Sequence, residues 1–246
     1  MYFPWLGIFE QLRLADMYCF YDDVQFSKGF YNRVQLRRNG KSSYITVPII
    51  KRSQNQIINT AQISYRENWI LDHRNKLKES LANAPYADDA IEIFDQVVSS
   101  KNSKLTEINK LCFKKLANYL GILSNKEFYN SAEIKTGNKK SSSKLLEICQ
   151  QLGAKIYLTG HGAMDYLDHQ LFEKNDIEVH YIKYQFSSYE RKNRDYTPYL
   201  SSLDPIAYLG INTKNSMQSK TVYWRDAIKS PSNLLPNFNK EVLNAI

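Results

Sequence analysis

The sequence has no long apolar run and contains few glycines and cysteines. Among its 246 residues there are 9 Gly and 3 Cys, and no window approaches about 18 consecutive apolar residues. The opening residues lack the basic and apolar regions of a signal peptide. The cysteines are far apart and have neither a CxxC motif nor paired spacing: Cys19, Cys112 and Cys149. These absences predict a cytoplasmic protein with no membrane span, no disulfide framework and no metal site.

Aromatic and basic residues are abundant instead. The chain has 18 Tyr and 11 Phe, and its formal net charge is +8. Tyrosine combines an apolar ring with a polar hydroxyl and therefore suits clefts, although a genome rich in A/T codons also raises the tyrosine content. A basic surface favours anionic partners. The longest stretch of biased charge, residues 28–52, carries seven Lys or Arg residues and no acid, and is where we first expect a phosphate contact.

The spacing of apolar residues predicts an α/β fold. From about residue 126 to residue 186, strands and helices alternate as β-α-β-α-β, which is typical of a mostly parallel sheet with helices on its faces. Strands are expected at 17–26, 56–64, 127–134, 155–159 and 178–186. Helices are expected at 6–15, at 143–152, and from Gly162 to about Lys174.

Three further features complete the predicted domain. Asn39-Gly40 lies between alternating segments and predicts an antiparallel hairpin near residues 33–47. Residues 68–121 contain three segments with apolar faces at helical spacing, which predicts a helical insertion. We therefore expect one α/β domain over residues 1–246, with a C-terminal extension at 211–246.

The start of the chain differs from an ordinary core segment, because it places Pro, Trp and Gly in a tight loop before a helix. Eight short motifs then follow in order: Tyr2-Phe3-Pro4-Trp5-Leu6-Gly7, Asp22-Asp23-Val24-Gln25-Phe26, Asn32-Arg33, Asn68-Trp69, Ala84-Pro85-Tyr86, Leu152-Gly153-Ala154, Leu158-Thr159-Gly160 and Tyr166-Leu167-Asp168. Together they resemble the WbqC-like family, over residues 2 to about 210. Each motif is short, and the specificity lies in the series.

The resemblance implies a role in the bacterial gene clusters that build O-antigens of lipopolysaccharide and other surface polysaccharides. It implies a transferase that modifies a nucleotide-linked amino sugar, by acylation or aminoacylation. The expected partners are this sugar and an acyl or aminoacyl donor, and no cofactor is indicated. The chain departs from the family at two places. Met1 stands where an apolar strand ending in Gln-Pro should already be complete, and His161 stands where the family has small residues or Pro.

Polar residues follow two of the predicted strands, and parallel sheets bind ligands at the carboxyl ends of their strands. Asp22 and Asp23 follow the first strand, and His161 follows the strand at 155–159. We predict Asp23, His161 and Asp22 as catalytic, since carboxylates and imidazole transfer protons near neutral pH. The alternatives are a strand-end turn or an ion pair with Arg33 for the two aspartates, and a structural role for the histidine.

The predicted substrate-binding residues come from the family motifs and the neighbouring loops: Tyr2, Trp5, Asn32, Arg33, Gly160, Tyr166 and Asp168. The Arg33 guanidinium suits phosphate, and a helix that follows the opening loop offers free N–H groups to an anion. The outline resembles nucleotidylyltransferases but lacks their His-x-x-His signature, which argues against adenylylation. The cluster at 139–144 is interpreted as a solvated helix entry, because it lacks the P-loop frame.

Two other classes of function remain open. One is a non-catalytic binding or scaffold protein of the same pathway. The other is nucleic-acid binding through residues 28–52, with Tyr31 and Tyr44 stacking on bases. No recognised nucleic-acid motif supports the second class.

Overall fold

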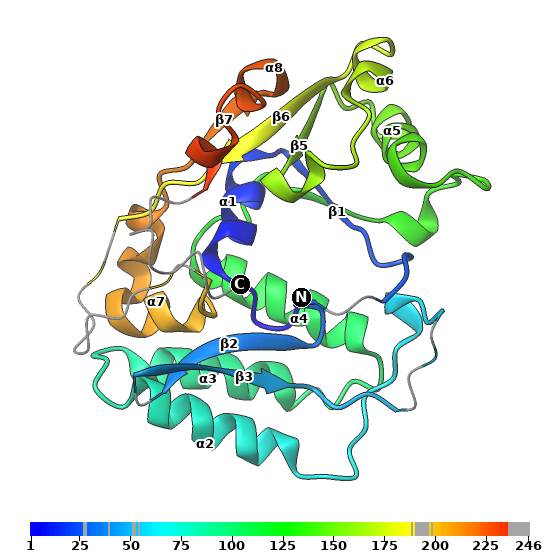
Figure 1. Ribbon diagram of the computed structural model, residues 1–246. Helices are drawn as coiled ribbons and strands as arrows, with labels where there is room; N and C mark the ends of the chain where they lie inside the picture. Colours follow the sequence, from blue (N-terminus) through cyan, green and yellow to red (C-terminus); the bar gives the residue numbers. More distant parts are fainter. Residues whose placement is uncertain are drawn as a thin grey trace.

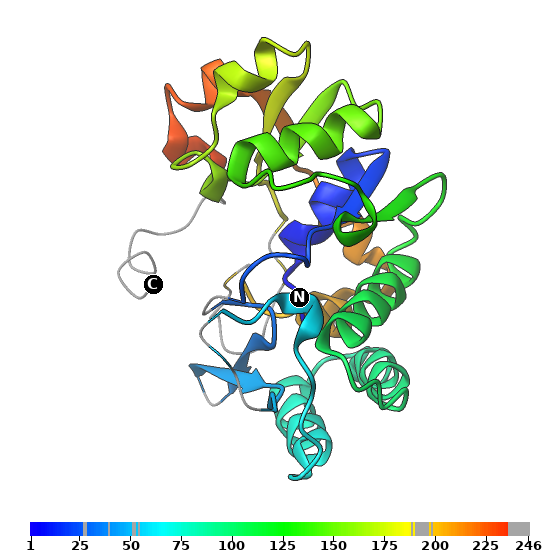
Figure 2. The same cartoon turned by 90° about the vertical axis from the view of Figure 1, so that its right-hand side faces the viewer.

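A computed structural model describes residues 1–235 except 27, 28, 39, 51, 52, 54, 188, 190–196 and 198. The predicted α/β class is confirmed. Figure 1 shows an upper part, in which α5, α6 and α8 surround the sheet of β5, β6 and β7, and a lower part, in which α2, α3 and α4 lie beside the β2–β3 hairpin. Helix α1 lies between the two parts. Figure 2 shows α5 lying across one face of the upper sheet.

The strands form short parallel and antiparallel pairs. β1 is parallel to β4, β5 is parallel to β6, β7 is antiparallel to β6, and β2 is antiparallel to β3. The strand bounds are β1 Met17–Phe20, β2 Arg33–Arg38, β3 Lys41–Thr46, β4 Glu127–Asn130, β5 Ile156–Thr159, β6 Glu178–Lys183 and β7 Lys220–Tyr223. The hairpin near 33–47 is confirmed by the pairing of Arg38 with Lys41, although Asn39 lies outside the described residues.

Most of the helices lie where the apolar spacing predicts them. Their bounds are α1 Leu6–Leu14, α2 Trp69–Leu81, α3 Ala87–Val98, α4 Leu105–Tyr119, α5 Ser141–Gln151, α6 His169–Glu173, α7 Leu203–Leu209 and α8 Trp224–Ala227. Helix α3 shows the cause: Ala90, Phe94 and Val97 follow a period of about 3.6 and are all buried. Gly121 ends α4 with a φ of 66°, a backbone conformation that glycine adopts without strain.

Several predicted elements are wrong in type or extent. The strand expected at 17–26 ends at Phe20, and the strand expected at 178–186 ends at Lys183. The strand expected at 56–64 is a 3₁₀ turn, Ile58–Thr60, flanked by isolated β-bridges. The strand expected at 127–134 ends at Asn130, and a 3₁₀ turn follows at Ser131–Glu133. The helix expected after Gly162 is interrupted, because the Asp168 carboxylate accepts a hydrogen bond from the Leu171 N–H and so starts α6 as a new helix.

The C-terminal segment does more than extend the domain. β7, which lies within residues 211–246, pairs antiparallel with β6 and completes the upper sheet. The sheet is therefore less uniformly parallel than the sequence predicted. Among the described residues, no helix combines the length and the apolar composition needed to cross a membrane.

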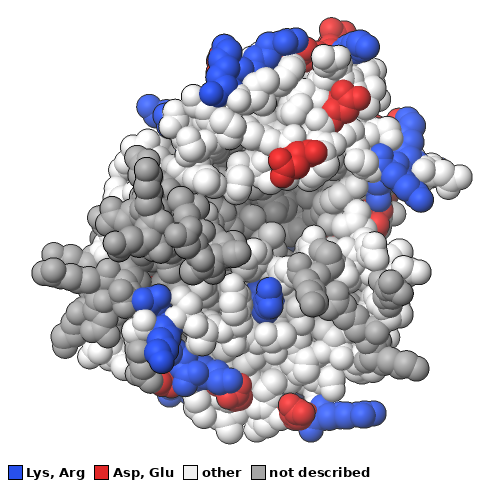
Figure 3. Space-filling model, viewed as in Figure 1, with Lys and Arg blue, Asp and Glu red and all other residues white. Residues whose placement is uncertain are grey.

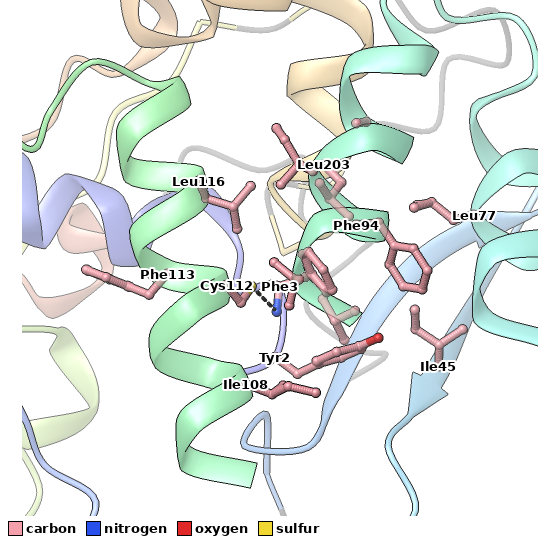
Figure 4. Close-up of a cluster of buried hydrophobic side chains, with 14 of the residues drawn as sticks. Tyr2, Phe3, Ile45, Leu77, Phe94, Ile108, Cys112, Phe113, Leu116 and Leu203 are labelled. Atoms are coloured by element: carbon pink, nitrogen blue, oxygen red, sulfur yellow. Dashed lines mark hydrogen bonds between the residues drawn. The ribbon is translucent and has the colours of Figure 1, made fainter. Parts of the chain in front are cut away.

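Two hydrophobic clusters hold the fold together. The larger one joins α1, α2, α3, α4, α7 and the hairpin. Figure 4 shows its centre, where Tyr2 and Phe3 lie between α4 and α3, and the Phe3 N–H donates to Cys112 Sγ at 3.2 Å. The smaller cluster lies in the upper part and includes Phe172, Val179 and Trp224. Burial of this apolar surface is the main stabilising term for both clusters.

A buried glutamate connects the two parts of the molecule. Glu10 on α1 is fully buried. Its Oε1 accepts from the Ser219 N–H at 2.8 Å and its Oε2 accepts from Arg13 Nε at 2.5 Å, while Arg13 Nη2 donates to Ser219 O at 2.6 Å. This network fixes α1 to the segment that leads into β7, and therefore places α1 under the carboxyl ends of β5 and β6.

Candidate functional site

The molecule is hollowed on the face shown in Figure 3, between the upper part and the hairpin below it. β1 and β5 both end on the side of the upper part that faces the hairpin (Figure 1). Strand ends in α/β sheets are the usual place for ligands. The residues that follow these two strands are therefore considered first.

Asp23 follows β1 and is held by two donors. Its Oδ1 accepts from Ser131 Oγ at 2.6 Å, and its Oδ2 accepts from Lys144 Nζ at 2.7 Å. Burial raises the pKa of Asp23, but the hydrogen bonds from Lys144 and Ser131 outweigh it, so that the pKa lies below its usual value. Asp23 is therefore a carboxylate at neutral pH, paired with a lysine that is itself only 9% exposed.

Asp22 points the other way, toward α4. Its Oδ2 accepts from Thr106 Oγ1 and lies 3.3 Å from Lys110 Nζ, and its backbone oxygen accepts from the Asn59 N–H at 2.9 Å. These contacts fasten the end of β1 to α4. The sequence alternative of an ion pair with Arg33 is seen for neither aspartate among the described residues, because the Arg33 guanidinium lies over the Tyr44 ring at 4.6 Å.

Gly160 and His161 follow β5. A Cβ on Gly160 would lie 3.1 Å from Tyr184 Oη, so the backbone here packs closely against β6 and its following residues. His161 begins a 3₁₀ turn, His161–Ala163, and is exposed. Partial burial lowers the pKa of His161, and the nearby Asp165 opposes that shift without cancelling it. The imidazole is therefore neutral at pH 7 and able to accept a proton.

Tyr166 and Asp168 are joined to the first turn of α5. Ser142 Oγ accepts from the Asp168 N–H at 3.0 Å and donates to Tyr166 O at 3.4 Å. The Asp168 carboxylate caps α6, whereas the Tyr166 side chain is 57% exposed. Since Lys144 lies on the same turn of α5 and binds Asp23, the structure brings Asp23, Tyr166 and Asp168 into one contact network.

The other predicted substrate-binding residues lie outside this network. The Tyr2 ring is fully buried, and its hydroxyl bonds to His73 Nδ1 at 3.1 Å. Trp5 packs against Tyr184, with ring centroids 4.9 Å apart. Asn32 Nδ2 donates to Val47 O at 2.8 Å and holds the end of the hairpin, and Arg33 lies on the hairpin itself.

Lys144 is the residue that sequence reasoning missed. The cluster at 139–144 was expected to be solvated, and Lys139 is indeed half exposed and pairs with Glu147. Lys144 is instead buried, with its Nζ 5.1 Å from the centre of the Tyr21 ring. It precedes Ile148 by four residues and thus shares the buried face of α5, a signal that the helical period contained.

The comparison with known proteins decides the family. A model of the WbqC-like protein family matches residues 1–216. The chain belongs to this family. The family resemblance drawn from the eight motifs is therefore confirmed. This WbqC-like chain is also similar to Rv1507c, an uncharacterized protein of Mycobacterium tuberculosis, with 28% identity over 216 residues that cover 85% of this chain and 90% of that protein. No solved structure matches.

The chemistry of this WbqC-like site is that of carboxylate, amine and phenol groups. In the described part of the chain, no group of three or more His, Cys, Asp or Glu residues could hold a metal ion. Cys19 lies on β1 close to the aspartates, and burial raises the pKa of its thiol to about 11. The thiol is therefore protonated at neutral pH and is a poor nucleophile.

A separate surface pocket of about 350 Å³ lies between β3 and α2. Its lining residues are Tyr44, Thr46, Pro48, Glu67, Asn68, Trp69, Asp72, His73 and Lys76. Both signs of charge occur in the lining, with Asp72 paired to Lys76 at 2.7 Å. None of the predicted site residues is among those that line it, so it is distinct from the network at Asp23.

Proposed function

We propose that this WbqC-like protein is a cytoplasmic transferase that adds an acyl or aminoacyl group to the amino group of a nucleotide-linked sugar for surface-polysaccharide assembly. The observation that carries the proposal is the pair formed by Asp23 and Lys144 at the carboxyl end of β1. The substrate class is the one that the resemblance to the family implies, and the net charge of +8 supports an anionic substrate.

The pair supports chemistry at an amine. Asp23 Oδ1 accepts from Ser131 and Oδ2 accepts from Lys144, and a carboxylate oxygen can accept a further hydrogen bond, so a substrate ammonium binds beside these two donors. Asp23 then takes a proton from this ammonium, and the freed nitrogen attacks the carbonyl carbon of the donor. The new N–C bond forms, and the bond between that carbon and the leaving group breaks, with its electrons remaining on the leaving group. The leaving group takes the second proton that the nitrogen loses as it becomes the amide. The Lys144 ammonium stabilises the negative charge that develops on the carbonyl oxygen.

A thermal-shift screen tests the substrate class. UDP-, dTDP- and GDP-linked amino sugars are compared with free ATP, acyl-CoA and short oligonucleotides. A ligand at 100 times its dissociation constant stabilises the native state by about 2.7 kcal/mol, which corresponds to several degrees in Tm. We expect one nucleotide-linked amino sugar to raise Tm selectively. A shift with oligonucleotides that disappears with added salt would indicate nucleic-acid binding instead.

Turnover of the selected sugar with a panel of acyl and aminoacyl donors is then followed by mass spectrometry of the product. Asp23→Asn is expected to lower kcat by about 10²- to 10⁴-fold, the range for loss of a general base. The matched control is Asp226→Asn, because Asp226 is exposed and pairs only with Lys229 in the described residues. Wild-type turnover by Asp23→Asn would overturn the proposed chemistry. Normal polysaccharide in cells carrying Asp23→Asn would favour the non-catalytic scaffold.

A further inference from the structure

The β2–β3 hairpin has two edges, and the described part of the chain covers one of them. Along β2, the Gln35 O accepts from the Ser201 N–H at 3.0 Å, and the Arg37 O accepts from Ser80 Oγ at 2.7 Å. β3 pairs with β2 and forms no strand pair or bridge with any other described residue. An uncovered strand edge presents N–H and C=O groups with which another chain can pair.

The register of the hairpin shows which groups of β3 face this edge. The Val47 N–H donates to Asn32 O at 2.7 Å, so these two residues form a hydrogen-bonded pair. Hydrogen-bonded and non-hydrogen-bonded pairs alternate along an antiparallel ladder, and Ser42, Tyr44 and Thr46 therefore belong to non-hydrogen-bonded pairs. Their N–H and C=O groups point away from β2, toward the uncovered edge.

The pocket between β3 and α2 gives this edge the space that an added strand needs. Its volume is about 350 Å³, with Tyr44 and Thr46 on one side and Trp69 and His73 of α2 on the other, and no described residue of β2 lines it. Ile45 is 1% exposed and points into the buried cluster shown in Figure 4. Because side chains alternate along a strand, a strand added to β3 directs every second side chain toward the pocket and the others onto the exposed face of the hairpin.

That exposed face of the hairpin is basic. Residues 33–47 contain four Lys or Arg residues and no acidic residue. The Arg33 guanidinium lies 4.6 Å from the centre of the Tyr44 ring, and Arg37 Nη1 donates to Ser42 Oγ at 3.2 Å. Both arginines thus reach from β2 across β3. Arg33 forms no ion pair with a described residue, and a carboxylate on an added strand supplies one.

These charges select the occupant of the edge. A second copy of the hairpin would place its own Lys and Arg residues beside those of the first, and like charges on neighbouring strands are destabilising. An acidic strand is attracted instead. Its acidic residues fit only every second position, because Glu67 and Asp72 line the pocket that receives the side chains between them.

We propose that the outer edge of β3 binds an extended acidic segment of a partner protein, which joins the hairpin as a third strand. Main-chain hydrogen bonds to Ser42 and Tyr44 supply affinity, and the arginines select Asp or Glu at alternate positions. The inference does not rest on the proposed function, because no residue of this edge belongs to the network at Asp23.

A peptide array tests the chemistry of the partner. It carries short peptides with Glu at every second position and varied residues between, beside matched peptides with Lys in place of Glu. We expect the full chain to bind a subset of the Glu peptides and none of the Lys peptides. If no Glu peptide binds, or if the Lys peptides bind equally well, the proposal is overturned.

Fluorescence anisotropy with the tightest Glu peptide tests the edge itself. Ser42→Pro removes an outward N–H without breaking a hydrogen bond to β2, and we expect affinity to fall by at least about 10-fold. Ser42→Ala keeps this N–H and should stay within about 2-fold of the wild type. Arg33→Gln is expected to weaken binding by about 2- to 5-fold, the range for an exposed ion pair. Its control is Lys229→Gln, because the Lys229 side chain is 71% exposed and pairs with Asp226.

Methylated peptides test strand addition without any change to the protein. Two versions of the tightest peptide are methylated on alternate backbone nitrogens, one version on each set. Only one set can face β3, so we expect one version to lose binding and the other to retain it. Equal effects of the two versions, or wild-type affinity in Ser42→Pro, would contradict strand addition. A wild-type dimer in analytical ultracentrifugation that Ser42→Pro converts to a monomer would assign the edge to a second copy and overturn the acidic partner.

Discussion

His73 makes the stability of this fold depend on pH. It lies on α2 beneath the hairpin, is only 2% exposed, and accepts or donates a hydrogen bond with the Tyr2 hydroxyl at 3.1 Å. Burial lowers the pKa of His73 from 6.5 to about 4, against a smaller opposing effect of Asp72. The folded state therefore holds the imidazole neutral, while the unfolded state binds a proton at any pH below about 6.5.

The sign and size of the effect follow from proton linkage. Between pH 6.5 and about 4 the unfolded state binds more protons than the folded state, so the stability contributed by His73 is complete above this window and is lost as the pH falls through it. With about 1.4 kcal/mol for each pH unit, the contribution lost between pH 7 and pH 4.5 is about 2.4 kcal/mol. Below pH 4 both states are protonated at this residue and no further loss occurs.

Urea unfolding at pH 7 and pH 4.5 measures this effect. We expect His73→Leu to be less stable than the wild type at pH 7 by about 1–3 kcal/mol, because the Tyr2 hydroxyl loses its partner. Its further loss on going to pH 4.5 should be smaller than that of the wild type by about 2.4 kcal/mol. Leu77→Ala is the control: it removes a buried neighbour on α2 and keeps His73, so the wild-type pH dependence should persist. An equal pH dependence in His73→Leu and the wild type would refute the reasoning.

Two further predictions concern α1. Glu10→Ala leaves the Arg13 guanidinium and the Ser219 N–H without their buried acceptor, and urea unfolding should show a loss of about 3 kcal/mol, while a loss below about 1 kcal/mol would show that water replaces the carboxylate. Gly7→Ala places a Cβ 2.1 Å from the Trp5 ring, so the indole must move. We expect a loss of about 1–3 kcal/mol and a shifted tryptophan emission, and an unchanged spectrum would contradict the close packing of the indole on this glycine.

The regular elements were largely predictable, because their signals come from residues close together in the chain. The apolar spacing located the segments of α1 to α4, and the Asn39-Gly40 pair located the hairpin. Where a second local signal competed, the prediction failed. Asp168 was taken as part of a continuing helix, and its carboxylate in fact begins a new one by capping Leu171.

The site was predictable in part. The polar ends of β1 and β5 were visible in the sequence, and Asp23, Tyr166 and Asp168 do share one network. Tyr2 belongs to a family motif, and a motif alone does not distinguish a ligand contact from a core ring. Lys144 was not predicted as a site residue, because it lies in a run of Lys and Ser residues and such runs are usually solvated.

The sequence by itself determined the family, the α/β class and most helices, because each depends on short motifs or on the period of a local pattern. Only the tertiary structure decided which of two adjacent aspartates pairs with Lys144 of α5. Asp23 binds Ser131 and Lys144, which are 108 and 121 residues away along the chain. Asp22 instead bonds to Thr106, 84 residues away, because successive side chains at the end of a strand point to opposite sides. Contacts at such separations exist only once β1, β4 and α5 have packed together, so no local pattern encodes them.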